Sequence, residues 1–151
     1  MRRPVSRRLA AGALAVLALG ACGGGEDSGG PMGEKRVDQD LAVVVVALDH
    51  PPVRQIMGEV DGTIAQFGDR VRVRHLDFES EQGQGFAEDK GVTGHVPLAI
   101  FLDGSPEATV NGRTARFVGF PRGRAPVPVA QGDWTLDELR GALAQRAGEP
   151  R

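Results

Sequence analysis

The chain contains one cysteine, Cys22, which limits the sulfur chemistry available to it. A single thiol cannot form an intramolecular disulfide or a cysteine-rich zinc site. Dithiol–disulfide exchange within one chain is also excluded, because it needs an attacking and a resolving thiol. The sequence has no G-x-S-x-G, Walker, dinucleotide-binding or H-E-x-x-H motif. We therefore expect no disulfide oxidoreductase activity and no cofactor.

Two histidines next to prolines are the other candidates for chemistry. His50 lies within Asp49–Pro52, directly before an expected helix, and His95 comes two residues before Pro97. An imidazole beside a carboxylate suits acid–base work, or the binding of zinc, nickel or oxidised copper if Asp49 joins it. One alternative is therefore a thiol-independent or metal-dependent enzyme, or a metal-delivery protein, that uses His50 and His95.

The same residues also have a purely structural interpretation. Asp49 would cap the helix and Pro51 or Pro52 would begin it, which leaves His50 simply exposed. A metal site would lack a third imidazole, because His75 falls on an expected central strand and is expected to point elsewhere. The structural interpretation is favoured, since nothing in the local sequence demands a catalytic histidine or a metal.

The apolar pattern predicts the elements that would position these residues. The run 41–47 (LAVVVVA) is continuous and β-branched, which is typical of a strand buried on both faces. From residue 53 the apolar side chains recur at helical spacing until Gly68, which is placed to end the helix. The predicted strands are 41–47, 70–78, 97–102, 108–110 and 113–118, and the predicted helices are 51–67, 86–90 and 135–147.

Two local signals define the C-terminal part. Asn111-Gly112 predicts a type I′ turn between two antiparallel strands. Thr135 and Glu138 form a capping box at the start of the last helix, and Trp134 is spaced to staple that helix through Leu139. The resulting order, β-α-β-α-β-β-α, predicts an α/β domain with a mixed sheet whose parallel strands come first.

This order resembles a thioredoxin-like domain from Leu41 to about Ala147. The resemblance is carried by the Val-rich strand that runs into a proline-containing helix start, by Gly91–Gly94 with Pro97 after it, by Phe117–Gly119 and by the last helix. It implies a three-layer sandwich that lacks the first strand and helix of thioredoxin itself. The family carries its Cys-x-x-Cys at the start of the first helix, and this chain has His-Pro-Pro-Val there instead.

The resemblance also implies a ligand groove. The family proline equivalent to Pro97 is cis and faces the helix start, although His95-Val96 makes this loop one residue longer than usual. Such a loop binds extended peptides by backbone pairing, which needs no thiol. A redox-inactive module that binds a protein segment or small ligand is therefore the favoured function. The expected ligand-binding residues at the groove are Asp49, His50, His95, Val96 and Pro97.

Residues 121–133 (PRGRAPVPVAQGD) form a long insertion before the last helix. By the resemblance it borders the groove, where it would act as a lid that offers Arg122 and Arg124 to an anionic or peptide ligand. A semi-rigid surface loop of polyproline character is the simpler alternative and is favoured.

The first 21 residues have the three parts of a secretory signal peptide. A basic start and the apolar run 9–21 lead to small residues directly before Cys22. Thirteen apolar residues are too few for the roughly 20 that a spanning helix needs. The ending Leu19–Cys22 resembles a bacterial lipobox, which implies cleavage before Cys22 and its modification with diacylglycerol and palmitate. The protein is then a lipoprotein on the extracytoplasmic face of a bacterial cell membrane.

The predicted organisation is a signal peptide (1–21), a flexible glycine-rich tether (22–40), a thioredoxin-like domain (41–148) and a short tail (149–151). Residues 22–151 hold 14 Lys and Arg against 20 Asp and Glu, a formal charge of −6. This acidic balance argues against nucleic acid as a partner. We expect the membrane, through the lipid on Cys22, and a protein or peptide of the cell envelope as partners.

Overall fold

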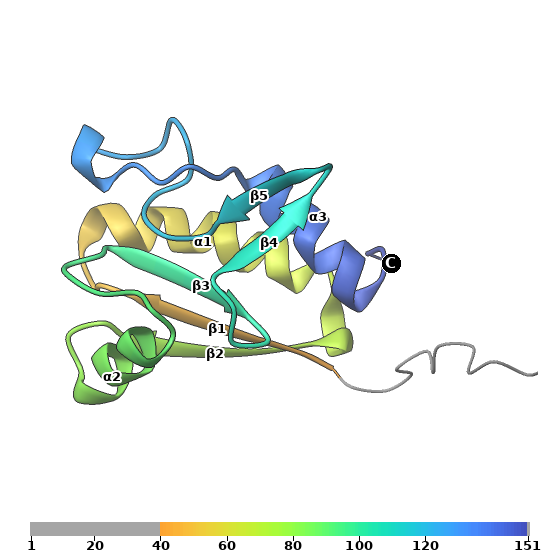
Figure 1. Cartoon of the computed structure of the whole chain (residues 1–151), viewed down its shortest axis with the longest axis horizontal. Helices are drawn as coiled ribbons and strands as arrows, with labels where there is room; N and C mark the ends of the chain where they lie inside the picture. Colours follow the sequence, from red (N-terminus) through yellow and green to blue (C-terminus); the bar gives the residue numbers. More distant parts are fainter. Residues whose placement is uncertain (1–39, 151) are drawn as a thin grey trace, which may run out of the picture. The chain divides into compact units, whose positions relative to one another are not determined.

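A computed structural model describes residues 40–150, which form a mixed α/β domain (Figure 1). Cys22, the predicted signal peptide and almost all of the predicted tether lie outside the described residues. The elements are β1 (Leu41–Ala47), α1 (Pro51–Ala65), β2 (Val71–Asp77), α2 (Glu81–Asp89), β3 (Leu98–Leu102), β4 (Glu107–Val110), β5 (Arg113–Arg116) and α3 (Leu136–Ala147), with 3-10 turns at Gly68–Arg70 and Pro128–Ala130. Among these residues, the helices are too short or too polar to cross a bilayer.

The central sheet has the strand order β2-β1-β3. β1 runs parallel to β2 and antiparallel to β3, so the predicted mixed sheet is confirmed. The free side of β3 is met by the chain after β5, since the Ile100 amide donates to Phe117 O at 2.9 Å and the Gly119 amide to Leu98 O at 2.8 Å. β2 is an edge strand in this sheet, so the central position expected for the strand of His75 is wrong.

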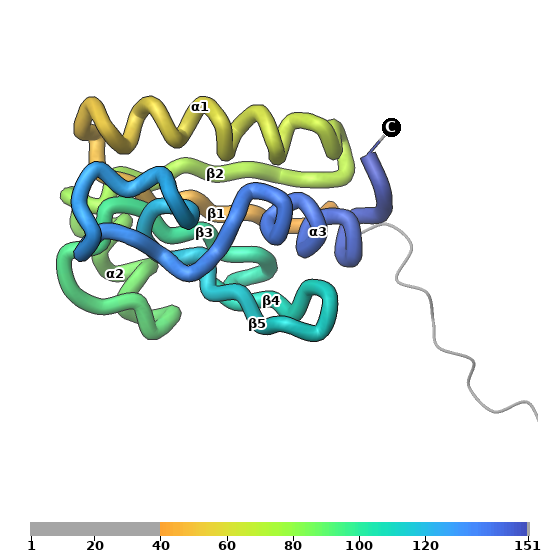
Figure 2. The backbone as a smooth tube through the Cα atoms, turned by 90° about the horizontal axis from the view of Figure 1, so that it is seen from above, coloured from red at the N-terminus to blue at the C-terminus, as the bar shows by residue number. Residues whose placement is uncertain are grey.

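Helices lie on both sides of the sheet, with α1 and α2 on opposite sides (Figure 2). On one side the Phe86 ring of α2 meets the Phe101 ring of β3 edge-on, with centroids 5.1 Å apart. On the other side α1 packs beside α3. Because both faces of β1 are covered, Val43, Val45 and Val46 are buried and Val44 is partly buried.

The second helix is longer than its sequence pattern predicted. It begins at Glu81 rather than near Phe86, because the Ser80 hydroxyl caps it and accepts a hydrogen bond from the Gly83 amide at 3.0 Å. Gly83 and Gly85 interrupt the apolar spacing in this segment, which is why the periodicity did not reveal its first turn.

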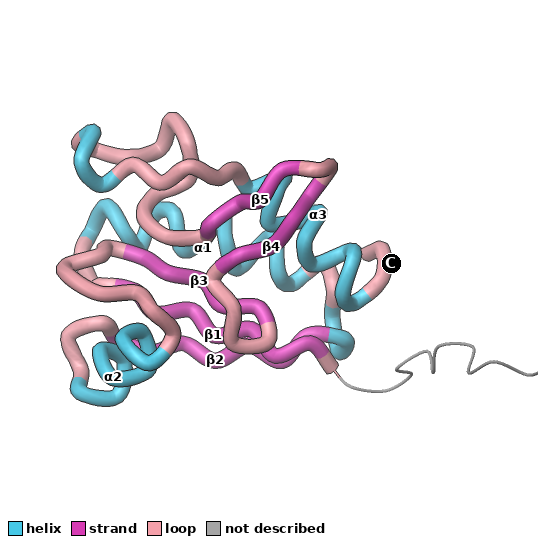
Figure 3. Tube along the Cα trace, in the orientation of Figure 1, coloured by secondary structure: helices cyan, strands magenta, loops and turns pink. Residues whose placement is uncertain are grey.

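The predicted turn and capping box of the C-terminal part are confirmed. Asn111 and Gly112 have φ values of 52° and 77°, as a type I′ turn requires. Thr135 and Glu138 form the reciprocal capping box that opens α3. The connection from β5 to α3 is a long loop (Figure 3), and Trp134 at its end is fully buried.

Candidate functional site

A hollow of about 430 Å³ opens at one end of the sheet. β1 and β2 are parallel and both finish there, and β3 is antiparallel and begins there. Three segments therefore meet at this end: the residues after β1, the turn from β2 into α2, and the loop that precedes β3. Its lining residues are Leu48, Phe78, Glu79, Gln84, Glu88, Gly94 and His95.

The hollow combines apolar and acidic lining residues. Leu48 and Phe78 are buried, whereas Glu79 and Glu88 are exposed. The apolar residues are fixed by the sheet, because the Leu48 amide donates to Pro97 O at 3.0 Å and the Phe78 amide to Ala47 O at 2.9 Å. Such a site would accept an apolar group together with a neutral or positively charged one.

The structure brings the two predicted histidines to this hollow. His95 lines it directly, and His50 Nε2 lies 3.8 Å from Oε1 of Glu79, another lining residue. Both side chains of the His50–Glu79 pair are about half exposed. Sequence reasoning missed Glu79. The signal that could have found it is its place just after β2, because the ends of parallel neighbouring strands meet at one edge of a sheet.

Asp49 is not part of this group. Its Oδ1 accepts a hydrogen bond from Arg54 Nη1 at 2.8 Å. The expected helix cap by Asp49 is wrong: His50 holds the N-cap position, and its side chain makes no capping bond. Pro51 and Pro52 occupy the first helical positions and offer no amide hydrogens to a capping group.

The metal alternative lacks its ligand set in this structure. Within residues 40–150, no three or more His, Cys, Asp or Glu side chains are grouped so that they could hold an ion. Asp49, His50 and His75 each pair with a different residue. Asp49 pairs with Arg54 and His50 with Glu79, while His75 Nε2 lies 2.9 Å from Asp61 Oδ1.

The loop before β3 has backbone groups that form no hydrogen bond within the described part of the chain. In the described part of the chain, the amide and carbonyl groups of residues 93–96 have no hydrogen-bond partner. Val96 and Pro97 are half-buried. The peptide before Pro97 is trans, since residues 40–150 contain no cis peptide, and the cis geometry implied by the resemblance is therefore wrong.

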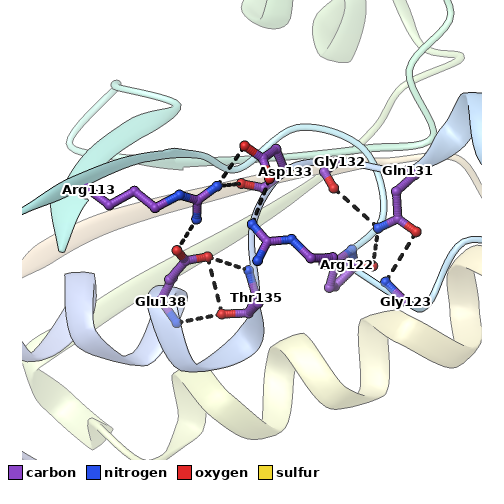
Figure 4. Close-up of polar contacts among 9 residues, drawn as sticks. Arg113, Arg122, Gly123, Gln131, Gly132, Asp133, Thr135 and Glu138 are labelled. Atoms are coloured by element: carbon purple, nitrogen blue, oxygen red, sulfur yellow. Dashed lines mark hydrogen bonds and ion pairs between the residues drawn. The ribbon is translucent and has the colours of Figure 1, made fainter. Parts of the chain in front are cut away.

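Ion pairs and hydrogen bonds fix the loop 121–133, the predicted lid, and its two arginines are paired with carboxylates. Arg122 Nη2 lies 2.6 Å from Asp133 Oδ1, and Arg124 Nη2 lies 3.0 Å from Glu59 Oε2 on α1. Gln131 closes the loop on itself, because its side chain donates to Pro121 O at 2.9 Å and accepts from the Gly123 amide at 3.2 Å (Figure 4). Neither arginine lines the hollow in this structure.

A charged network anchors the base of this loop to the hairpin and to α3. Arg113 bonds both Asp133 and Glu138, the capping-box carboxylate (Figure 4). Hydrogen bonds from Arg122 and then Arg113 hold the pKa of Asp133 below its ordinary value. Burial alone would raise the pKa of Glu138, but hydrogen bonds from Arg113 and Thr135 together outweigh it and lower that pKa.

Acid is expected to destabilise the fold through these two carboxylates. Their pKa values are lower in the folded than in the unfolded chain, so the stabilisation is complete above about pH 4.5 and is lost as the pH falls through the lowered values. In Glu138→Gln the Tm should therefore fall less steeply below about pH 4.5 than in the wild type. Thermal unfolding followed by circular dichroism across this pH range measures the slopes. Asp137→Asn, which removes an exposed carboxylate from the same turn, is the control. Equal slopes for wild type and Glu138→Gln would contradict the assignment.

Comparison of the chain with protein-family models, with curated proteins and with solved structures finds no match. Its function must therefore be inferred from its own residues. The hollow, its two histidines and the unpaired backbone beside it form the most complete candidate site in the described part of the chain.

Proposed function

We propose that this protein is a redox-inactive, thioredoxin-like lipoprotein that binds an extended protein segment or a small ligand at the cell envelope. The observation that carries the proposal is the hollow of about 430 Å³ beside a loop whose backbone groups are unpaired. A buried apolar floor would supply affinity, and free amide and carbonyl groups would fix the orientation of a bound segment.

The arrangement of the elements supports a thioredoxin-like assignment. The order β2-β1-β3, with residues 117–119 on the far side of β3, fits the mixed sheet that the resemblance implies. The positions of α1 and α2 on opposite sides of the sheet fit its three layers. The trans peptide before Pro97 is a departure from the family pattern.

The helix start favours a neutral or basic ligand over an anion. Helix N-termini bind anions through free amide hydrogens, but Pro51 and Pro52 have none. The Arg54 amide is already bonded to His50 O at 2.9 Å, which leaves Val53 as the one unpaired amide donor in this first turn, within the described residues. Glu79 and Glu88 add negative charge to the neighbouring hollow.

Binding at this site can be tested with an array of extended nonapeptides of varied sequence. Val96→Pro removes an amide that has no partner in the described fold, so it should weaken capture at least tenfold. Val96 also packs partly against the core, so the Tm of the variant is measured alongside to show that the domain remains folded. His95→Ala should weaken capture of the same peptides. Gln145→Ala, an exposed position on α3, is the control and should leave capture unchanged. Equal capture by all four proteins would place the binding surface elsewhere.

The membrane anchor is tested separately. Cys22→Ser removes the proposed lipid attachment site, so nearly all of the exported protein should move from the membrane to the soluble fraction. Fractionation followed by immunoblotting measures this, and the cleaved length of the variant confirms its export. A correctly exported Ser variant that stays with membranes would disprove an anchor that depends on Cys22.

A further inference from the structure

The outer side of β2 is an open sheet edge. Among residues 40–150, β2 pairs with β1 alone, and most of its side chains are exposed. Val73 is 40% exposed in the middle of the strand. An edge strand carries a row of amide and carbonyl groups that can pair with another extended chain.

The two faces of this edge differ in chemistry. The register places Val43 beside Val73 and Val44 beside Arg74, so successive residues of β2 turn to opposite faces. On the face toward α1, a groove of about 160 Å³ runs along the strand. Apolar residues make up most of its lining: Ile64, Ala65, Val71 and Val73.

The opposite face of the strand is basic. Arg72 and Arg74 are both exposed there. The Arg74 guanidinium lies over the Phe86 ring, 5.5 Å from its centroid, which holds the charge close to the strand. Arg72 Nε lies 3.4 Å from Asp40 Oδ2, so this face already attracts a carboxylate from the chain that enters β1.

We propose that the β2 edge binds an extended segment of another protein in which apolar and acidic residues alternate. A strand added at this edge turns its side chains to the two faces in alternation. Apolar residues of the segment would fill the groove beside Val71 and Val73, and acidic residues would lie opposite Arg72 and Arg74. This surface is separate from the hollow, whose acidic rim suits ligands of the opposite charge.

A second copy of the chain is a poor occupant of this edge. Pairing β2 with another β2 would place Arg72 and Arg74 next to the same residues of the other copy, and like charges on adjacent strands are destabilising. Charged side chains on an edge strand also disfavour unspecific pairing with other strands. An acidic, alternating segment is the kind whose pairing they favour.

The test uses two fluorescein-labelled heptapeptides, Thr-Val-Glu-Val-Glu-Val-Thr and its lysine counterpart, with the exported protein purified in non-ionic detergent. Fluorescence anisotropy should show binding of the glutamate peptide, at least tenfold tighter than the lysine peptide and weakened by salt. Arg72→Glu/Arg74→Glu should lose at least tenfold for the glutamate peptide and prefer lysine. Lys90→Glu/Arg140→Glu changes the net charge equally at an exposed and a partly exposed position away from β2, and should behave as the wild type.

Hydrogen exchange of the same samples locates the peptide. The expected result is slower exchange of residues 71–77 when the glutamate peptide is added. Equal binding of both peptides, or a glutamate peptide unaffected by the charge reversal, would overturn the proposal. So would slowed exchange confined to residues 93–96, which would assign the peptide to the hollow. Slow exchange, without peptide, of the β2 amides that do not bond to β1, lost in the charge-reversal variant, would identify the chain's own tether as the occupant and overturn the proposal as well.

Discussion

Replacing Trp134 by Ala is expected to lower the free energy of unfolding by about 3–5 kcal/mol. The side chain is fully buried, and its indole ring meets the Phe117 ring edge-on with centroids 5.6 Å apart. Its Nε1 donates to Gly119 O at 3.1 Å within the interior. The alanine would therefore leave a large cavity and also a buried carbonyl without its partner.

Trp134→Phe separates these two effects. Phenylalanine keeps an aromatic ring against Phe117 but cannot donate to Gly119 O, so a smaller loss of about 1–3 kcal/mol is expected. Urea unfolding followed by circular dichroism measures both variants on one scale. If Trp134→Ala shifted the urea midpoint no more than Trp134→Phe, packing of this ring would not be what secures the loop to the core.

The sequence predicted the elements best where a signal is local. The β-branched run of β1, the Asn111-Gly112 turn and the Thr135–Glu138 capping box each depend on residues within one short segment, and all three are present. The staple pattern found a packing position for Trp134. Its full burial depends on the loop that returns beside Phe117, which no local pattern contains.

Features that depend on distant residues could not be predicted in this way. The sequence placed Arg122 and Arg124 in a loop next to the expected groove, but their partners Asp133 and Glu59 are chosen by the folded path. The sequence alone does not show that Arg122 and Arg124 are paired with carboxylates, whereas in the structure both form ion pairs. The edge position of β2 is likewise set by sheet order, which spacing within the strand does not encode.

The sequence predicted the two histidines of the candidate site but not Glu79. His50 was singled out at the expected helix start and His95 in the loop before Pro97, and both reach the end of the sheet where the hollow opens. Glu79 lies beside His50 and lines the hollow together with His95, although it is 29 residues from the first and 16 from the second in the sequence. It occupies that position because β1 and β2 are parallel and end together.

Gly83→Ala is expected to lower the free energy of unfolding by about 3 kcal/mol and to distort the hollow. A Cβ at Gly83 would lie 2.0 Å from Asp77 O, the last carbonyl of β2. That carbonyl cannot easily move, since it accepts hydrogen bonds from the Ser80 amide at 3.1 Å and the Ser80 hydroxyl at 2.7 Å. The first turn of α2 must therefore shift relative to β2, and Phe78 and Glu79 of the hollow lie in the turn between them.

Gly85→Ala in the same helix is the matched control. A Cβ at Gly85 meets no atom within 4 Å, and alanine is the better helix former, so a gain of about 0.5–1 kcal/mol is expected. Urea unfolding gives the stabilities, and the nonapeptide array reports on the hollow. Equal stability of the two variants would show that α2 moves freely against the end of β2. Because Gly83 contacts no ligand in this scheme, weaker capture by Gly83→Ala with normal capture by Gly85→Ala would mean that binding depends on the close approach of α2 to β2.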